Sequence, residues 1–145
     1  MIGPREGAGM HGLPGDFTPP SRFIRAVAFS QSEVQAATAD EAVLKAFHIL
    51  NQFDIPLGSV RDKTDGGVEL TQWTAVSDLK NLRWYFKTYD DQSIRMVDLK
   101  QAVEAAKGEP RTIKMESTQP IANASTTFMS GKQASDTPQG KSAAE

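Results

Sequence analysis

The chain of 145 residues contains no cysteine, and this absence excludes several kinds of site. These residues form no disulfide, supply no thiol nucleophile and build no cysteine-based metal site. Cysteine usage therefore carries no information about the cellular compartment.

Strong charge and long apolar runs are absent as well. The formal net charge is only −2, which gives no electrostatic reason to expect nucleic acid or an anionic membrane surface as a partner. No apolar run approaches the roughly 20 residues of a membrane-spanning helix. The length suits one domain that buries a core.

Residues 9–23 form the most distinctive segment that is present. Glycines and prolines alternate there with the apolar side chains Met10, Leu13 and Phe17. Because a flexible linker of this composition would be polar, we predict an ordered loop held against the core. Such loops often carry function.

The pattern after this loop predicts a strand over residues 22–29. Alternation would place Arg22 with Ile24, Ala26 and Ala28 on one face, and Arg25 with three apolar residues on the other. Both faces are largely apolar, which is typical of a strand covered on both sides.

A helix follows, with Thr38 as N-cap and Glu41 completing a capping box. Its apolar residues recur at helical spacing and predict a stripe that packs on a sheet: Val43, Ala46, Phe47, Leu50 and Phe53. Pro56 and Gly58 end this region.

Residues 68–77, 82–89 and 93–99 are rich in β-branched and aromatic side chains. The short connections between them predict an antiparallel meander. The helix and the meander together give an α+β fold. We expect one domain over residues 1–118 and a disordered tail over residues 119–145, where Ser, Thr, Ala, Gln and Gly dominate.

Arg22 is the strongest candidate for chemistry. An unpaired guanidinium beside apolar neighbours is costly, so we expect Arg22 to meet a carboxylate, an oxyanion or solvent at the strand end. The residues alone favour solvent. Arg25, predicted to point to the opposite face, is interpreted as a structural ion-pair or surface residue.

The loop of residues 12–16 has two interpretations of equal weight. Leu13 and Pro14 line a substrate pocket, or the loop turns a corner with Asp16 capping backbone amides. The aromatic residues Trp73, Trp84, Tyr85 and Phe86 could form an acyl pocket, but aromatic strand residues more often belong to the core.

Other catalytic and metal motifs find little support. His11 and His48 lack metal-ligand spacing, so we predict no metal site, and Asp90-Asp91 is more typical of a turn. Ser21 and Ser77 have no histidine at a recognisable spacing, which leaves a serine triad unsupported.

Several motifs in order point to one family. Gly-Leu-Pro-Gly-Asp at residues 12–16 precedes Pro-Ser-Arg-Phe-Ile-Arg-Ala at 20–26. Matching segments follow at residues 46–50, 71–74, 85–90 and 93–99. Over residues 9–99 the chain resembles the C-terminal part, less than half, of the choloylglycine hydrolase and penicillin V acylase family of linear amide C–N hydrolases.

The resemblance implies a fold and a mechanism. Members fold as an αββα sandwich of two antiparallel sheets between helices, of which this chain would supply the C-terminal part with one packed amphipathic helix. An N-terminal cysteine attacks the amide carbonyl with its own α-amine as base. The arginine of Pro-Ser-Arg-Phe belongs to the active site there, so the resemblance makes Arg22 the catalytic residue of this chain and leaves the nucleophile unassigned.

The resemblance also implies the substrates and the setting. Family substrates are conjugated bile salts, penicillin V and N-acyl homoserine lactones, cleaved without a cofactor. Members are commonly tetramers. The parent enzyme would be periplasmic or secreted in a Gram-negative bacterium and cytoplasmic otherwise.

Two hypotheses therefore stand. The first is a C-terminal fragment of such a hydrolase that is inactive alone, because it lacks the half with the nucleophile. The second is a non-catalytic remnant or binding module that retains the second half of the fold. An upstream reading frame that encodes the cysteine would favour the first.

Overall fold

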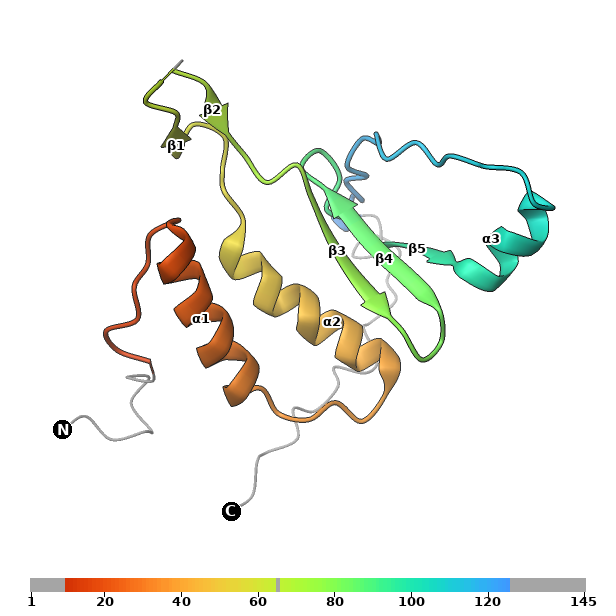
Figure 1. Cartoon of the computed structure of the whole chain (residues 1–145), viewed down its shortest axis with the longest axis horizontal. Coiled ribbons are helices and arrows are strands. Elements are labelled where there is room, and N and C mark those ends of the chain that lie inside the picture. Colours follow the sequence, from red (N-terminus) through yellow and green to blue (C-terminus); the bar gives the residue numbers. More distant parts are fainter. Residues whose placement is uncertain (1–9, 65, 126–145) are drawn as a thin grey trace.

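An antiparallel sheet with helices on one side organises the part of the chain that the structure describes. The computed structural model describes residues 10–64 and 66–125 (Figure 1). Within them the elements, in order, are α1 (Pro19–Ser32), α2 (Ala39–Leu50), the 3₁₀ turn η1 (Asn51–Phe53), β1 (Val60–Arg61), β2 (Val68–Glu69), β3 (Trp73–Asp78), β4 (Arg83–Thr88), β5 (Arg95–Asp98) and α3 (Leu99–Ala106).

The predicted meander is confirmed as β3–β4–β5. β3 pairs with β4 from Trp73↔Thr88 to Asp78↔Arg83, and β4 pairs with β5 from Arg83↔Asp98 to Phe86↔Arg95. The strand predicted over residues 68–77 is divided, because Thr71 bonds to Ile55 instead of continuing a ladder. The Thr71 amide donates to Ile55 O (3.2 Å) and the Ile55 amide donates to Thr71 Oγ1 (2.9 Å).

The strand predicted over residues 22–29 is wrong, because these residues lie in helix α1. Pro19 and Pro20 occupy its first turn, where their fixed φ suits a helix and their missing N–H groups would have no intrahelical partner. The buried residues Ser21 and Arg25 are one helical turn apart. Residues 23–29 are nearly all apolar, so their sequence does not distinguish the spacing of a helix from that of a strand.

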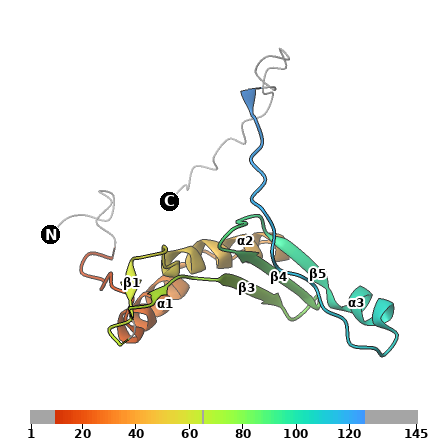
Figure 2. The same ribbon diagram turned by 90° about the horizontal axis from the view of Figure 1, so that it is seen from above.

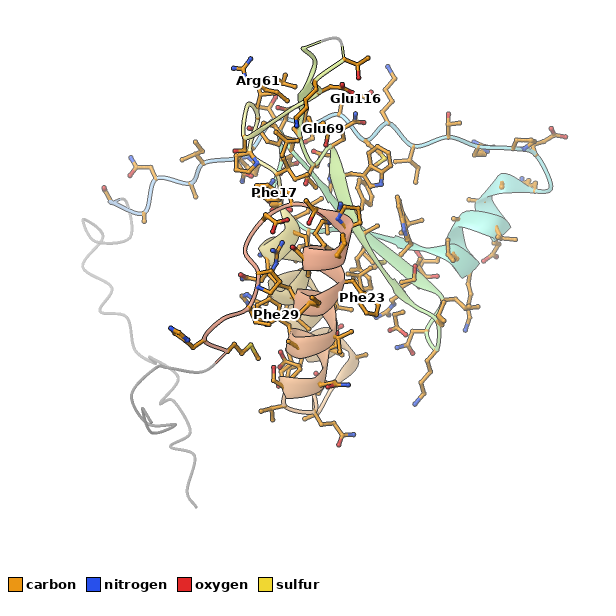
Figure 3. The ribbon with its side chains drawn as sticks, turned by 60° about the vertical axis from the view of Figure 1, so that its left-hand side comes forward. Phe17, Phe23, Phe29, Arg61, Glu69 and Glu116 are labelled. Carbon is orange, nitrogen blue, oxygen red and sulfur yellow. The ribbon has the colours of Figure 1, made fainter. Side chains whose placement is uncertain are left out.

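The change from strand to helix redistributes the side chains of this segment. Phe23 and Phe29 share a face in the strand prediction, but they project from different sides of α1 (Figure 3). Arg25 turns inward, while Arg22 is exposed.

The predicted helix over the capping box is confirmed as α2. Thr38 Oγ1 accepts from the Glu41 amide (3.2 Å), and Glu41 Oε2 accepts from the Ala37 amide (2.8 Å). Val43 and Phe47 from its apolar stripe are buried with Tyr85 of β4, and Val76 of β3 packs against them. This contact is the core of the described part.

The sheet has one covered and one open face. α2 lies along the face that carries Val76 and Tyr85, and the described residues place no helix across β3 and β4 on the opposite side (Figure 2). On that side Trp73 is 57% exposed and Trp84 stacks on Phe86 with ring centroids 4.7 Å apart. Phe86 is buried on this side beside Trp84 and the Arg95 guanidinium. We call this surface the open sheet face; it comprises Trp73, Ala75, Ser77, Trp84, Phe86, Thr88, Arg95 and Val97.

Helix α3 was not predicted, although Asp98 supplies a clear start signal. Its Oδ1 accepts from the amides of Lys100 (3.1 Å) and Gln101 (3.2 Å), which caps the helix. None of the helices in the described ranges is long and apolar enough to cross a membrane.

The tail predicted over residues 119–145 is described only up to residue 125. Gln119 is tied to the β4–β5 turn, since its amide donates to Asp90 O (3.0 Å) and its Oε1 accepts from the Gln92 amide (2.6 Å). The rest of the predicted tail, residues 126–145, lies outside the described residues.

Candidate functional site

The loop of residues 12–16 is tied to the start of α1 by Asp16. Asp16 Oδ1 accepts from the Thr18 amide (2.8 Å) and from the Thr18 hydroxyl, and Oδ2 accepts from Ser21 Oγ (2.7 Å). These donors, the Thr18 hydroxyl first and then Ser21, lower the pKa of Asp16 to about 2. The capping interpretation of Asp16 therefore describes this residue.

Arg25 ties the same loop to α1 from the inside. Its Nη1 donates to Pro14 O (2.8 Å) and Asp16 O (2.7 Å). Its guanidinium carbon lies 5.4 Å from the centroid of the Phe53 ring. Arg25 is therefore a buried structural residue without a carboxylate partner in residues 10–64 and 66–125.

Arg22 lies where two hollows meet. One has a volume of about 470 Å³ and an apolar lining of Pro19, Phe23, Ala26, Leu50 and Phe53. The other has a volume of about 350 Å³ and is lined by Ile55 and by residues 70–73, which include Thr71 and Gln72. Arg22 is exposed at this junction, where its guanidinium can donate hydrogen bonds to a ligand.

Leu13 and Pro14 line neither of these hollows. Both are half-buried, and Pro14 O is bonded to Arg25. Their role as substrate-binding residues stays a prediction.

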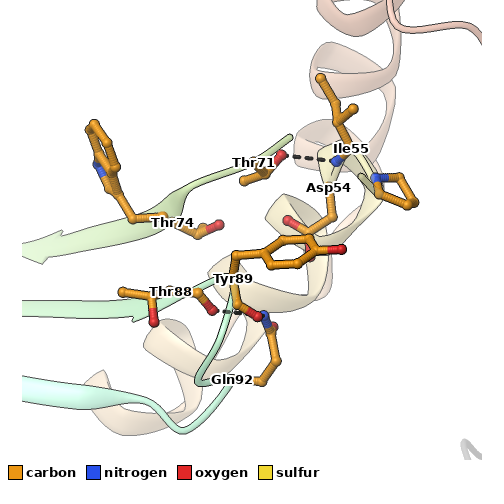
Figure 4. A pocket seen from close by; sticks show the side chains of 9 residues that line it. Asp54, Ile55, Thr71, Thr74, Thr88, Tyr89 and Gln92 are labelled. Atoms are coloured by element: carbon orange, nitrogen blue, oxygen red, sulfur yellow. Dashed lines mark hydrogen bonds between the residues drawn. The ribbon is translucent and has the colours of Figure 1, made fainter. Parts of the chain in front are cut away.

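A third hollow, of about 150 Å³, lies between the end of η1 and the sheet (Figure 4). The polar groups that line this hollow form hydrogen bonds with one another. Thr71 accepts from the Ile55 amide, and Gln92 Nε2 donates to Thr88 O (2.8 Å). Behind it the buried ammonium of Lys87 donates to Asn51 Oδ1 (2.6 Å) and Gln92 Oε1 (2.7 Å). We interpret this hollow as part of the structural contact between η1 and the sheet, and we call it the third hollow.

The four candidate aromatic residues separate in the structure. Tyr85 belongs to the core with Val43 and Phe47, as the core interpretation predicts. Phe86 is buried on the other side of the sheet, where the half-buried Trp84 stacks on it. Trp73 lines both the smaller of the two hollows beside Arg22 and the third hollow. Leu50 and Phe53 share the lining of the apolar hollow with Arg22, which no sequence pattern indicated, because this placement depends on α1 being a helix.

The described residues hold no cluster of three potential metal ligands. Asp91 belongs to a turn, as its sequence suggested, because the Ser93 amide donates to its Oδ1 (2.9 Å). That bond, then the Ser93 and Ser117 hydroxyls, lower the pKa of Asp91.

Comparison with known proteins agrees with these motifs. The model of the linear amide C–N hydrolases, choloylglycine hydrolase family, matches residues 4–106. Among curated relatives, an uncharacterized protein of Paramecium bursaria Chlorella virus 1 is 44% identical over 94 residues, which are 62% of this chain and 34% of that protein. The bile salt hydrolase/transferase of Clostridium perfringens is 35% identical over 94 residues, 65% of this chain and 28% of that protein.

Solved structures share the fold. A mutant conjugated bile acid hydrolase from Clostridium perfringens matches with a TM-score of 0.66 and 32% identity, over 81% of this chain and 35% of that one. Penicillin V acylase from Agrobacterium tumefaciens matches with a TM-score of 0.54 and 21% identity, over 61% and 28%. The chain thus spans about a third of the length of these relatives.

The fold is therefore α+β, with the architecture of the C-terminal part of an αββα N-terminal-nucleophile hydrolase sandwich. The predicted amphipathic helix packed on the sheet is α2, and α1 lies beside it (Figure 1). With its motifs, its fold and its match over residues 4–106, the chain belongs to the choloylglycine hydrolase family of linear amide C–N hydrolases.

Proposed function

We propose that the chain is the C-terminal portion of a hydrolase that cleaves linear amide bonds, and that these 145 residues are inactive alone. The observation that carries the proposal is the exposed Arg22 at the junction of the two hollows. Arg22 occupies the arginine position of the family motif Pro-Ser-Arg-Phe.

The lining of the hollows suits the two halves of an amide substrate. Pro19, Phe23 and Phe53 offer an apolar surface to an acyl group. Gln72 offers a polar side chain to the amine side. We propose substrates of the type of conjugated bile salts, penicillin V or N-acyl homoserine lactones, each with an amide between an acyl group and a polar amine.

Arg22 would act on charge at the reacting centre. Amide hydrolysis by a cysteine passes through a thiolate and a tetrahedral oxyanion, both negatively charged. A fixed guanidinium can orient the thiolate or balance these charges as they develop. The nucleophile itself must come from outside these residues, because they contain no cysteine.

The experiment compares the isolated chain with an assembled enzyme. By assembled enzyme we mean this chain combined with the portion of the Clostridium perfringens relative that lies outside the matched third. We expect release of glycine or taurine from conjugated bile salts by the assembled enzyme only. Activity of the isolated chain above a heat-treated control would contradict the proposal.

The alternative is a non-catalytic binding module. The exposure of Arg22 is the observation that favours it, because an exposed guanidinium beside an apolar hollow can bind an anionic apolar ligand without reaction. Binding of intact substrate by the isolated chain, with no turnover on assembly, would select this alternative.

As the family commonly forms tetramers, we expect the active species to be a homo-oligomer, which its mass in solution would test.

A further inference from the structure

Arg25 has an unusual environment for a buried cation. Its side chain is only 7% exposed, and no carboxylate of the described residues forms an ion pair with it. A buried guanidinium without a counter-ion depends on dipoles held in place around it. The carbonyl groups of Pro14 and Asp16, at 2.8 and 2.7 Å from Nη1, are these dipoles.

The same guanidinium contacts the wall of the hollow beside Arg22. Its Cζ lies 5.4 Å from the centroid of Phe53, within the range of a cation–π contact. Phe53 lines the apolar hollow together with Leu50. The buried Nε has no hydrogen-bond partner in the described residues, and the hydrogen bonds that Arg25 forms with them go to the loop.

We infer that Arg25 is a positioning residue that couples the loop of residues 12–16 to the aromatic wall of the hollow beside Arg22. One planar group fixes two carbonyls with its edge and one ring with its face, which a lysine cannot reproduce. Displacement of the loop would therefore shift Phe53, and with it the shape of the hollow. The importance of this coupling for substrate rests on the proposed function, but the coupling itself does not.

The first test uses the full chain and needs no substrate. Hydrogen exchange is followed at the amides of Leu13 and Thr18, which are bonded to Met10 O (3.2 Å) and Asp16 Oδ1 (2.8 Å). In Arg25→Met we expect both amides to exchange about tenfold faster or more, while amides of the α2–sheet core keep their protection. Arg22→Met, which removes the exposed arginine of the same helix, is the matched control and should leave both rates unchanged.

Arg25→Lys separates positioning from simple packing. An ammonium can bond to the loop carbonyls but does not lie flat on an aromatic ring, so the loop amides should regain protection while the Phe53 ring resonances remain shifted from their wild-type positions. Unchanged loop exchange in Arg25→Met, or an equal increase at core amides, would overturn the inference.

Kinetics of the assembled enzyme provide the second readout. We expect Arg25→Lys to raise KM by about tenfold with kcat within about twofold of wild type, because the shape of the binding surface changes and the reacting groups do not. A loss confined to kcat would overturn the inference. If wild-type assembled enzyme is inactive, the proposed function fails and the exchange experiment alone decides the role of Arg25.

Discussion

At the scale of single residues, the account depends on the different surroundings of two arginines in α1. Arg22 is exposed and free to meet a ligand, while Arg25 is buried and bonded to the loop. The sequence motif identifies Arg22 by resemblance. The strand predicted over residues 22–29 would have placed Arg22 and Arg25 on opposite faces, but these residues form a helix. In the helix the two arginines are neighbours on one side, and their contacts distinguish them: Arg25 bonds to the loop, whereas Arg22 lines the two hollows.

Arg22→Ala in the assembled enzyme should therefore lower kcat by about 10²–10³ while the thermal midpoint changes little. Arg22→Lys should restore only part of the rate, because one ammonium cannot replace a planar fork of donors. Steady-state kinetics and thermal unfolding of the three proteins test this together. Near-normal turnover of a folded Arg22→Ala enzyme would remove our catalytic assignment.

Asp16 predicts a response to acid in the loop. Its pKa is lowered to about 2 in the folded chain, below the value of about 3.9 for an unfolded aspartate. The contribution of this carboxylate to stability is therefore present above about pH 4 and is lost as the pH falls through about 2. The Thr18 amide resonance should titrate near pH 2, and Asp16→Asn should abolish that step. A midpoint near 4 would show that the Thr18 and Ser21 hydroxyls do not stabilise the charge.

At the scale of elements, predictability follows how local the determining interaction is. α2 was predicted because its capping box and apolar stripe lie within the helix itself. β4 and β5 were predicted because short turns and β-branched residues specify a meander. α1 was missed although Pro19 and Pro20 are a local start signal, because the nearly continuous apolar sequence hides the helical period. The hollows beside Arg22 join α1 to residues 50–55 and 70–73, so no local pattern could show them.

The N-cap of α2 allows a test of this element. Thr38→Ala should lower the free energy of unfolding by about 1 kcal/mol, because the Glu41 amide loses its acceptor. Thr38→Ser keeps the hydroxyl and is the matched control. Equal unfolding midpoints in urea for wild type and Thr38→Ala would show that the cap contributes nothing.

The core contact between α2 and the sheet should be more sensitive. Phe47 is 3% exposed and packs with Val43 and Tyr85. Phe47→Ala should cost about 3–5 kcal/mol through lost burial and the cavity that remains. Leu44→Ala, at an exposed position of the same helix, should cost far less. Similar losses in the two variants would contradict the burial described here.

At the scale of the whole molecule, the open sheet face is the surface that bears on the proposal that the chain is a portion of a longer hydrolase. An antiparallel sheet with one covered face normally presents polar residues to water, yet this face carries both tryptophans of the chain, Trp73 and Trp84. The chain spans only about a third of its relatives, whose sandwich fold places a second sheet against the first. We expect the missing part of the fold to cover this face.

Because both indoles lie on the open sheet face, the wavelength of the intrinsic tryptophan emission shows whether that face is exposed to water or covered. Mixing the chain with the nucleophile-bearing portion of the Clostridium perfringens relative, prepared with its own tryptophans replaced, should shift the emission to shorter wavelength as the indoles leave water. Trp73→Ala should weaken the association, whereas Leu44→Ala on the exposed side of α2 should not. An unchanged spectrum in a complex that forms would place the contact elsewhere.

Reconstitution of amide hydrolysis from the two portions tests the central claim most directly. The measurement is the release of glycine or taurine from conjugated bile salts by the 145-residue chain, by the nucleophile-bearing portion, and by their mixture. We predict hydrolysis by the mixture alone, with loss of turnover when the mixture contains Arg22→Ala. Hydrolysis by the isolated chain, or a stable complex that binds these amides without cleaving them, would contradict the account.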